Sequence, residues 1–197
     1  LGCDTFNKDA IELIYSTKGR PTQNPTIAHI LDSSWVELLT LNWSKQCEQL
    51  ASMFWPGPLT IVLPKKNTVP ASACGGRDTV AIRCPLHPVA SQLLASFGGP
   101  ISAPSANLSG YVSPTTAAHV EQEFNGTQMV IDGGSCEKGI ESTVLSLVND
   151  PTILRPGTIT AEEIENIIGP VSQHEQSDQS DSPGTMAQHY SPHTNVM

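Results

Sequence analysis

Short β-rich apolar runs alternate along this chain with stretches whose apolar residues recur at helical spacing. This alternation constrains the fold most, because strands interleaved with helices are typical of a layered α/β domain built on a twisted sheet. The pattern predicts strands at residues 26–31, 59–63, 79–83, 101–103, 129–132, 142–147 and 152–154, and helices at 8–18, 33–41, 44–54, 88–97, 113–124 and 160–168. We therefore expect a single α/β domain with a twisted mixed sheet flanked by helices, whose strand order the pattern leaves open.

Length and composition fit one such domain followed by a tail. The chain has 197 residues, of which 38% are hydrophobic, and this is enough for a core. We expect the domain to span residues 1–169 and a solvated linker to span 170–197, which begins with a stretch rich in Ser, Gln and Asp. Because no run approaches the ~18 apolar residues of a membrane span and no signal-peptide pattern opens the chain, a soluble cytoplasmic protein is expected.

Basic residues are scarce, and their positions are informative. The formal net charge is −9 with only ten Lys and Arg residues, which opposes a broad nucleic-acid footprint. Lys18, Arg20, Arg83 and Arg155 stand at the ends of apolar segments or in Gly/Pro turns, where loop-borne sites are built. This placement indicates anion binding in one cleft.

Two of these cations lie close together where the first predicted helix ends, in the sequence KGRPTQNP over residues 18–25. Lys18 supplies a compact charge and Arg20 a bidentate fork, so the pair suits neighbouring phosphate oxygens. Asn24 can add a directional hydrogen bond. A solvated basic end of the helix, favoured by the helix dipole, is the alternative.

Two further arginines close predicted strands. Arg83 ends the run TVAIR, and ligands of open α/β sheets commonly bind beyond the carboxyl ends of strands, so Arg83 is well placed to hold a carboxylate. Arg155 repeats this arrangement in the sequence LRPG. A structural salt bridge is the alternative for both residues.

Small hydroxyl residues cluster between a predicted strand and a predicted helix, in SAPSANLSG and the SPT that follows. Backbone N–H groups and the helix N-terminus can receive a phosphate there, whereas an ordinary Ser/Thr turn with Ser113 as the helix cap is the alternative. Further along, Glu141 follows a Gly-rich stretch and could support a metal ion or another site residue, although a lone carboxylate is more often solvated.

Several well-known motifs do not occur. The sequence lacks a GxxxxGK[ST] phosphate loop, a GxGxxG fingerprint, an HExxH zinc motif and a GxSxG nucleophile elbow. Its histidines have no metal-ligand spacing, and its five cysteines form no C-x-x-C pair, which favours free thiols. We therefore predict no protein-bound metal and no nucleophilic triad.

Taken in order, six blocks of the sequence closely resemble the YrdC family of threonylcarbamoyl-AMP synthases. The blocks are KGRPTQNPTIAHI, FWPGPLTIVL, TVAIRCPLHPVA, APSANLSGYVSPT, DGGSCEKGIESTV and ILRPGTIT. The resemblance covers residues 1–169 and implies a YrdC-like fold with a positively lined cavity for ATP, L-threonine and bicarbonate. The later HYSP sequence resembles the linker of the long form, whose N-terminal strand segment and smaller C-terminal domain are expected to be missing here.

The block positions also imply a role for each site residue. The resemblance assigns ATP to Arg20, Asn24, Thr79, Ser105, Ser113, Arg155 and Tyr190, and threonine to His29, Arg83, the Ala103 backbone and Ser142. Lys18 and Arg20 are the expected catalytic residues near the phosphates. Mg²⁺ is expected to arrive with the triphosphate.

The implied activity is nucleotidyl transfer. L-Threonine, bicarbonate and ATP give L-threonylcarbamoyladenylate and pyrophosphate, the first step of threonylcarbamoyladenosine formation in tRNA. The tRNA is then modified by a downstream transferase, so this protein is expected to act on tRNA only indirectly. Two other functions stay open: a binding module for structured, double-stranded RNA with the same fold, and the carbamoyl-transfer relative found inside hydrogenase-maturation enzymes.

Overall fold

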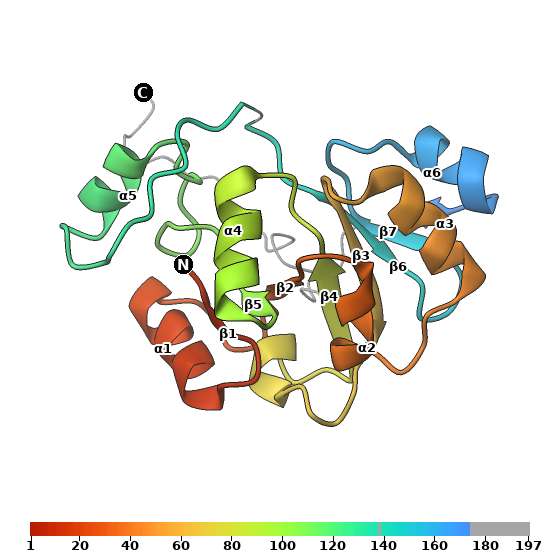
Figure 1. Ribbon diagram of the computed structural model, residues 1–197, viewed down its shortest axis with the longest axis horizontal. Coiled ribbons are helices and arrows are strands. Elements are labelled where there is room, and N and C mark those ends of the chain that lie inside the picture. The colour runs from red at the N-terminus through yellow and green to blue at the C-terminus, as the bar shows by residue number, and fades with distance from the viewer. Residues whose placement is uncertain (138, 174–197) are drawn as a thin grey trace.

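One mixed sheet forms the centre of the molecule. The computed structural model describes residues 1–137 and 139–173, and within them the sheet has eight strands in the order β1-β5-β2-β4-β3-β6-β7-β8 (Figure 1). The strands are β1 (Cys3–Asp4), β2 (Ile27–His29), β3 (Leu59–Pro64), β4 (Thr79–Arg83), β5 (Ile101–Ser102), β6 (Thr143–Ser146), β7 (Thr152–Arg155) and β8 (Ser172–Gln173). The pairs β2/β4, β3/β6 and β7/β8 are parallel and the others antiparallel. The predicted α/β fold with a mixed sheet is confirmed.

The helices are α1 (Lys8–Lys18), α2 (Val36–Leu39), α3 (Lys45–Phe54), α4 (Pro88–Phe97), α5 (Ala117–Glu123) and α6 (Ala161–Ile168), with 3-10 turns at Ser33–Trp35 and Ala71–Cys74. Four of the helices, α1, α3, α5 and α6, begin at a capping side chain, whereas α2 and α4 have none. The Asn7 side chain accepts a hydrogen bond from the Ala10 N–H and starts α1. Thr160 and Glu163 form a reciprocal capping box that starts α6.

The two faces of the sheet differ in what covers them. On one face, strand residues pack with helical residues in two large clusters, to which Leu39 of α2, Leu50 of α3 and Ile164 of α6 contribute. Figure 1 shows α3, α4 and α6 in front of the sheet on this side. The opposite face carries a small cluster formed by Ile27, Val62, Ala81 and Val144, which are all strand residues. No helix of the described residues contributes to this cluster, and we call this second side the helix-free face.

Strand register brings polar strand ends together on the helix-free face. β2 and β4 run parallel with His29 opposite Arg83. Because side chains alternate along a strand, His29 shares the face of Ile27, and Arg83 shares the face of Ala81. Two neighbouring parallel strands therefore end with an imidazole and a guanidinium side by side.

A β-bulge in β7 decides where Arg155 points. Val144 pairs with Arg155 and Leu145 pairs with Ile153, so Leu154 is an extra residue without a partner in the register. Ile153 packs with the helices, and strict alternation would put Arg155 on that same side. The extra residue instead sets Arg155 opposite Val144, on the helix-free face.

Some predicted boundaries were wrong. No strand forms at 129–132, where the described residues are irregular. The helix predicted at 113–124 begins only at Ala117, because Thr116 rather than Ser113 caps it. The helix predicted at 33–41 shrinks to a 3-10 turn and the short α2. The sheet also continues to Gln173, beyond the predicted start of the linker at 170.

No helix in the described part of the chain is both long and apolar enough to cross a membrane.

Candidate active site

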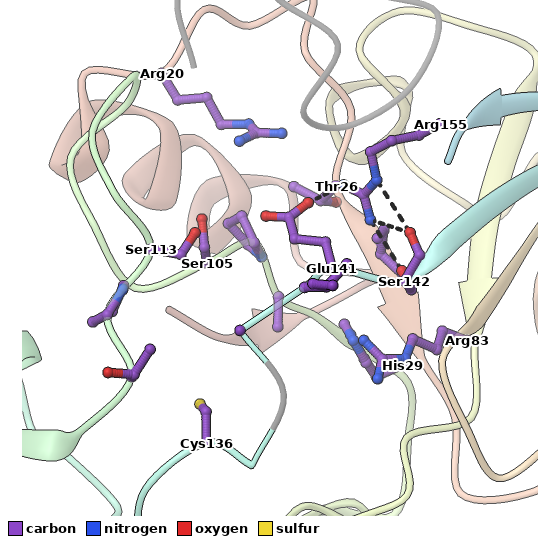
Figure 2. A pocket seen from close by; sticks show the side chains of 17 residues that line it. Arg20, Thr26, His29, Arg83, Ser105, Ser113, Cys136, Glu141, Ser142 and Arg155 are labelled. Carbon is purple, nitrogen blue, oxygen red and sulfur yellow. Dashed lines mark hydrogen bonds and ion pairs between the residues drawn. The ribbon is translucent and has the colours of Figure 1, made fainter. Parts of the chain in front are cut away.

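A cavity of about 380 Å³ opens on the helix-free face of the sheet (Figure 2). This volume lies within the range of small-ligand sites. The residues that line it are Arg20, Thr26, Ile27, His29, Arg83, Ala103, Pro104, Ser105, Ser113, Pro114, Thr115, Cys136, Gly139, Ile140, Glu141, Ser142 and Arg155. The cavity thus gathers predicted site residues from points far apart in the sequence.

His29 and Arg83 come from the parallel pair of strand ends. The Arg83 Nε donates a hydrogen bond to the Gly57 carbonyl at 3.0 Å, which fixes the guanidinium at the cavity wall. Burial, followed by the charge of Arg155, lowers the pKa of Arg83. Burial, followed by the charge of Arg83, lowers the pKa of His29 to about 4, so this imidazole is neutral at pH 7.

Arg20 is held in place by the turn that follows α1. Gly19 ends the helix with a φ of 58°, a left-handed conformation that glycine adopts without strain. The Arg20 Nη2 then donates to the Asn24 Oδ1 at 2.8 Å and to the Pro25 carbonyl at 2.7 Å. Asn24 is 3% exposed and does not line the cavity, so the structure places it behind Arg20 rather than against a ligand.

Lys18 lies beneath the cavity wall. Its side chain is 2% exposed, and its Nζ donates to the Ser105 carbonyl at 2.7 Å and also to the Asn107 carbonyl. Burial, followed by the charge of Arg20, lowers the pKa of Lys18 to about 7. A solvated helix end is therefore the wrong alternative, and the ammonium anchors the hydroxyl-rich turn instead of lining the cavity.

Ser105 and Ser113 line the side of the cavity opposite Arg155, as Figure 2 shows. The Ser113 Oγ is buried and has no hydrogen-bond partner among the described residues. It is available to a ligand because Thr116, three residues later, caps α5 in its place. The Thr116 side chain accepts from the His119 N–H, so this capping position is already filled.

Arg155 forms hydrogen bonds and an ion pair with the two residues that lead into β6. Its Nη2 donates to the Ser142 carbonyl at 2.8 Å and to the Ser142 Oγ at 3.0 Å, and its Nη1 forms an ion pair with Glu141. The Ser142 Oγ also bonds the Thr60 Oγ1 at 2.8 Å. The salt bridge considered as an alternative for Arg155 is present, and it lies inside the cavity.

The backbone at Gly157 packs closely against the start of β6. A Cβ on Gly157 would lie 2.4 Å from the Thr143 N and 2.5 Å from the Glu141 carbonyl oxygen. The turn after Arg155 can therefore pack against the start of β6 only because residue 157 has no side chain.

Two predicted site residues lie elsewhere. Thr79 opens β4, four residues before Arg83, and does not line the cavity. At about 3.3 Å per residue, the two Cα atoms are roughly 13 Å apart along the strand. Tyr190 lies outside the described residues.

The sequence analysis did not assign several residues of the cavity wall to the site. Cys136 and Ile140 come from the irregular segment that follows α5, where a strand was predicted in part. Pro104 lies between the predicted site residues Ala103 and Ser105, and Thr26 was expected only as the first residue of a strand.

The cavity has the chemistry of an anion site without a metal cage. Within the described residues, no three His, Cys, Asp or Glu side chains gather to hold a metal ion. Glu141 is the one carboxylate in the described lining, and Arg155 already pairs with it. These residues do not fit a protein-held Mg²⁺, and an ion that accompanies a triphosphate would take its ligands from phosphate and water.

A sheet face that gathers three arginines and several serines in one cavity defines an α/β domain suited to an anionic ligand. Residues 1–157 match the model of the Sua5/YciO/YrdC family, which is described as "Telomere recombination". The chain therefore belongs to this family.

A second family model corrects one expectation. Residues 159–197 match the model described as "Threonylcarbamoyl-AMP synthase, C-terminal domain". The expectation that the C-terminal domain is missing was therefore wrong, since this part of the chain matches it.

Curated proteins and solved structures agree on the relationship. The chain is 43% identical to a threonylcarbamoyl-AMP synthase of Pyrococcus abyssi, over 100% of this chain and 60% of that protein. It is 46% identical to one of Bacillus subtilis, over 98% of this chain and 58% of that protein. It superposes on a crystal structure of P. abyssi Sua5 complexed with L-threonine with a TM-score of 0.92 and 42% identity, over 97% of this chain and 58% of that one. The chain thus spans less than two thirds of the length of these relatives.

Proposed function

We propose that this chain forms the nucleotidyl-transfer part of a threonylcarbamoyl-AMP synthase, which converts L-threonine, bicarbonate and ATP to L-threonylcarbamoyladenylate and pyrophosphate. One observation carries the proposal: Arg20, Arg83 and Arg155 converge on a single cavity together with serine hydroxyls. The names of the curated relatives and the threonine complex of the P. abyssi protein support this choice of substrates.

The end of the cavity at β2 and β4 suits the amino acid. Arg83 is anchored through its Nε, so its terminal nitrogens can grip a carboxylate bidentately. The neutral His29 beside it can contact the rest of the substrate without adding a second charge. The Ala103 backbone and Ser142 complete this end of the lining.

The end of the cavity at Arg20 suits the triphosphate. Asn24 and the Pro25 carbonyl fix the Arg20 guanidinium before any ligand arrives, so little side-chain entropy is lost when it meets a phosphate. The Ser113 hydroxyl has an unused donor here. Lys18 contributes by holding the turn that carries Ser105.

The reaction needs positioning and charge stabilisation rather than a nucleophilic side chain. The threonine amine attacks bicarbonate and forms a carbamate with loss of water. A carbamate oxygen then attacks the α-phosphorus of ATP, and the bond to the β-phosphate oxygen breaks to release pyrophosphate. Fixed guanidinium groups stabilise the charge that spreads over the phosphoryl oxygens in such a transfer. A Mg²⁺ ion would be held by the triphosphate rather than by side chains of the described residues, and it would supply neutralisation of part of the phosphate charge.

The test is pyrophosphate release by the full-length protein that contains this chain. We expect release from ATP only when both L-threonine and bicarbonate are present, and loss of release in Arg20→Ala. Omission of either substrate and replacement of L-threonine by D-threonine are the matched controls. Release that is independent of threonine, or none at all in the complete mixture, would refute the proposal.

The RNA-binding alternative finds less support. Lys18 and Arg155 are buried, and Arg20 and Arg83 line the cavity, so these cations do not form an open basic surface. We propose that tRNA is served through the released adenylate and a downstream transferase. Salt-sensitive RNA retention in a gel shift without ATP turnover would instead favour the binding module.

A further inference from the structure

The carboxylate of Glu141 lies among the arginines of the cavity. Figure 2 shows it between Arg20 and Arg155, with its side chain extending from the segment that leads into β6. Of the described lining residues it alone carries a negative charge. Its side chain is 25% exposed, whereas that of Arg155 is 9% exposed.

Glu141 interacts with every buried cation around the site. It forms an ion pair with Arg155, and its charge partly offsets the lowering by burial of the pKa values of Lys18, Arg20 and Arg83. The charge of Arg155 acts in the opposite direction on Arg20 and Arg83. The carboxylate therefore relieves repulsion among guanidinium groups that share one cavity.

The two members of the ion pair are held very differently. Arg155 is buried and donates three hydrogen bonds to the carbonyl and hydroxyl of Ser142, which is itself bonded to Thr60. Glu141 is the more exposed partner and stands on irregular backbone. If the pair opens, the carboxylate can swing away while the guanidinium stays in place.

We propose that Glu141 is a displaceable counter-ion, which occupies Arg155 while the cavity is empty, yields to a phosphate group of the nucleotide, and returns to Arg155 as pyrophosphate leaves. This inference rests on the proposed function, because the polyphosphate is the competing anion. Three fixed guanidinium groups without an internal anion would bind pyrophosphate tightly and release it slowly. Competition by the carboxylate lowers that affinity and speeds product release.

The test compares pyrophosphate binding by the full-length wild type and Glu141→Gln in calorimetry, without metal and at low salt. Glutamine keeps the size and an acceptor oxygen but removes the charge. We expect the variant to bind pyrophosphate about tenfold more tightly, mostly through slower dissociation. Glu137→Gln is the matched control, since Glu137 is exposed nearby but does not line the cavity, and it should change the affinity less than twofold.

Each other outcome overturns the inference. Equal tightening in Glu137→Gln would indicate a general effect of net charge. Unchanged metal-free pyrophosphate affinity together with weaker Mg-ATP binding would make Glu141 a metal ligand instead. If the wild type bound ATP and pyrophosphate but Glu141→Gln bound no more tightly, only this inference would fail; if the wild type bound neither, the proposed function would fail with it.

A second variant covers the case in which Glu141→Gln does not fold. Glu141→Asp keeps the charge but shortens the side chain by one methylene, which draws the carboxylate away from Arg155. We expect an intermediate tightening of about threefold, and an affinity equal to that of the wild type would count against the proposal. Thermal unfolding measured in parallel establishes that each variant is folded.

Discussion

Replacing Lys18 by Met tests whether this lysine is an internal anchor or a phosphate ligand. Lys18 donates from a 2% exposed side chain to the carbonyls of Ser105 and Asn107. Methionine has a similar length and no charge, so it leaves both carbonyls without this donor, at about 1–3 kcal/mol each. The same change also removes the desolvation of a buried ammonium. At pH 7 the two effects oppose each other, and the pH dependence of stability is the more telling quantity.

The sign and size of that dependence follow from the lowered pKa. Burial lowers the pKa of Lys18 from 10.5 to about 7, so between these values the unfolded chain binds more protons than the folded one. The free energy of unfolding therefore rises with pH in this window. At 1.36 kcal/mol per pKa unit, the gain from pH 7 to pH 9 is about 2 kcal/mol. Below pH 7 the contribution levels off.

Urea unfolding of the wild type and Lys18→Met at pH 6, 7, 8 and 9 measures this gain. The wild type should become more stable relative to the variant as the pH rises, with most of the change above pH 7. Cys3, Cys74 and Tyr15 have raised pKa values that favour folding at low pH, but they are common to both proteins and cancel in the difference. A difference that is constant from pH 7 to pH 9 would refute the buried-anchor assignment.

Three further predictions concern the cavity and its walls. Arg83→Ala should weaken threonine binding and Arg20→Ala should weaken ATP binding, each by about 2–5 kcal/mol in calorimetry, and equal losses for both ligands would contradict this division. Thr79→Ala should leave the ATP affinity within about twofold, because the hydroxyl lies at the far end of β4, and a tenfold loss would restore its predicted role. Gly157→Ala should destabilise the protein by about 1–3 kcal/mol in urea unfolding, because its Cβ meets the Thr143 N; unchanged stability would show that the turn can shift.

The sequence predicted the positions of the helices better than those of the strands. Helices with a strong period and a capping residue, such as α1, α4 and α6, were located to within a residue. The strand expected at 129–132 failed because its apolar residues, Met129 and Ile131, are exposed and pair with nothing in the described sheet. A local sequence pattern cannot reveal whether a neighbouring strand is in place to pair with the segment.

The membership of the cavity was also largely predictable, but the contacts within it were not. The resemblance to the family and the placement of cations at strand ends located Arg20, Arg83 and Arg155, and all three line the cavity. Lys18 and Asn24 were expected to meet the ligand, yet in the structure they hold Ser105 and Arg20, which line the cavity. Residue type and spacing bring a side chain near a site, whereas the direction in which it points depends on tertiary packing.

The bulge in β7 determines the face of the sheet on which Arg155 lies. Without the bulge, Leu154 would pair with Val144 and Arg155 would face the apolar layer beneath α3 and α6, where an unpaired guanidinium is costly to bury. The same sequence in a strand without the bulge would thus turn an arginine of the cavity wall into a charge within the core. Deleting Leu154, by contrast, would place Arg155 directly after Ile153 and keep it on the helix-free face, so related chains are best compared by the register of this strand as well as by the presence of the arginine.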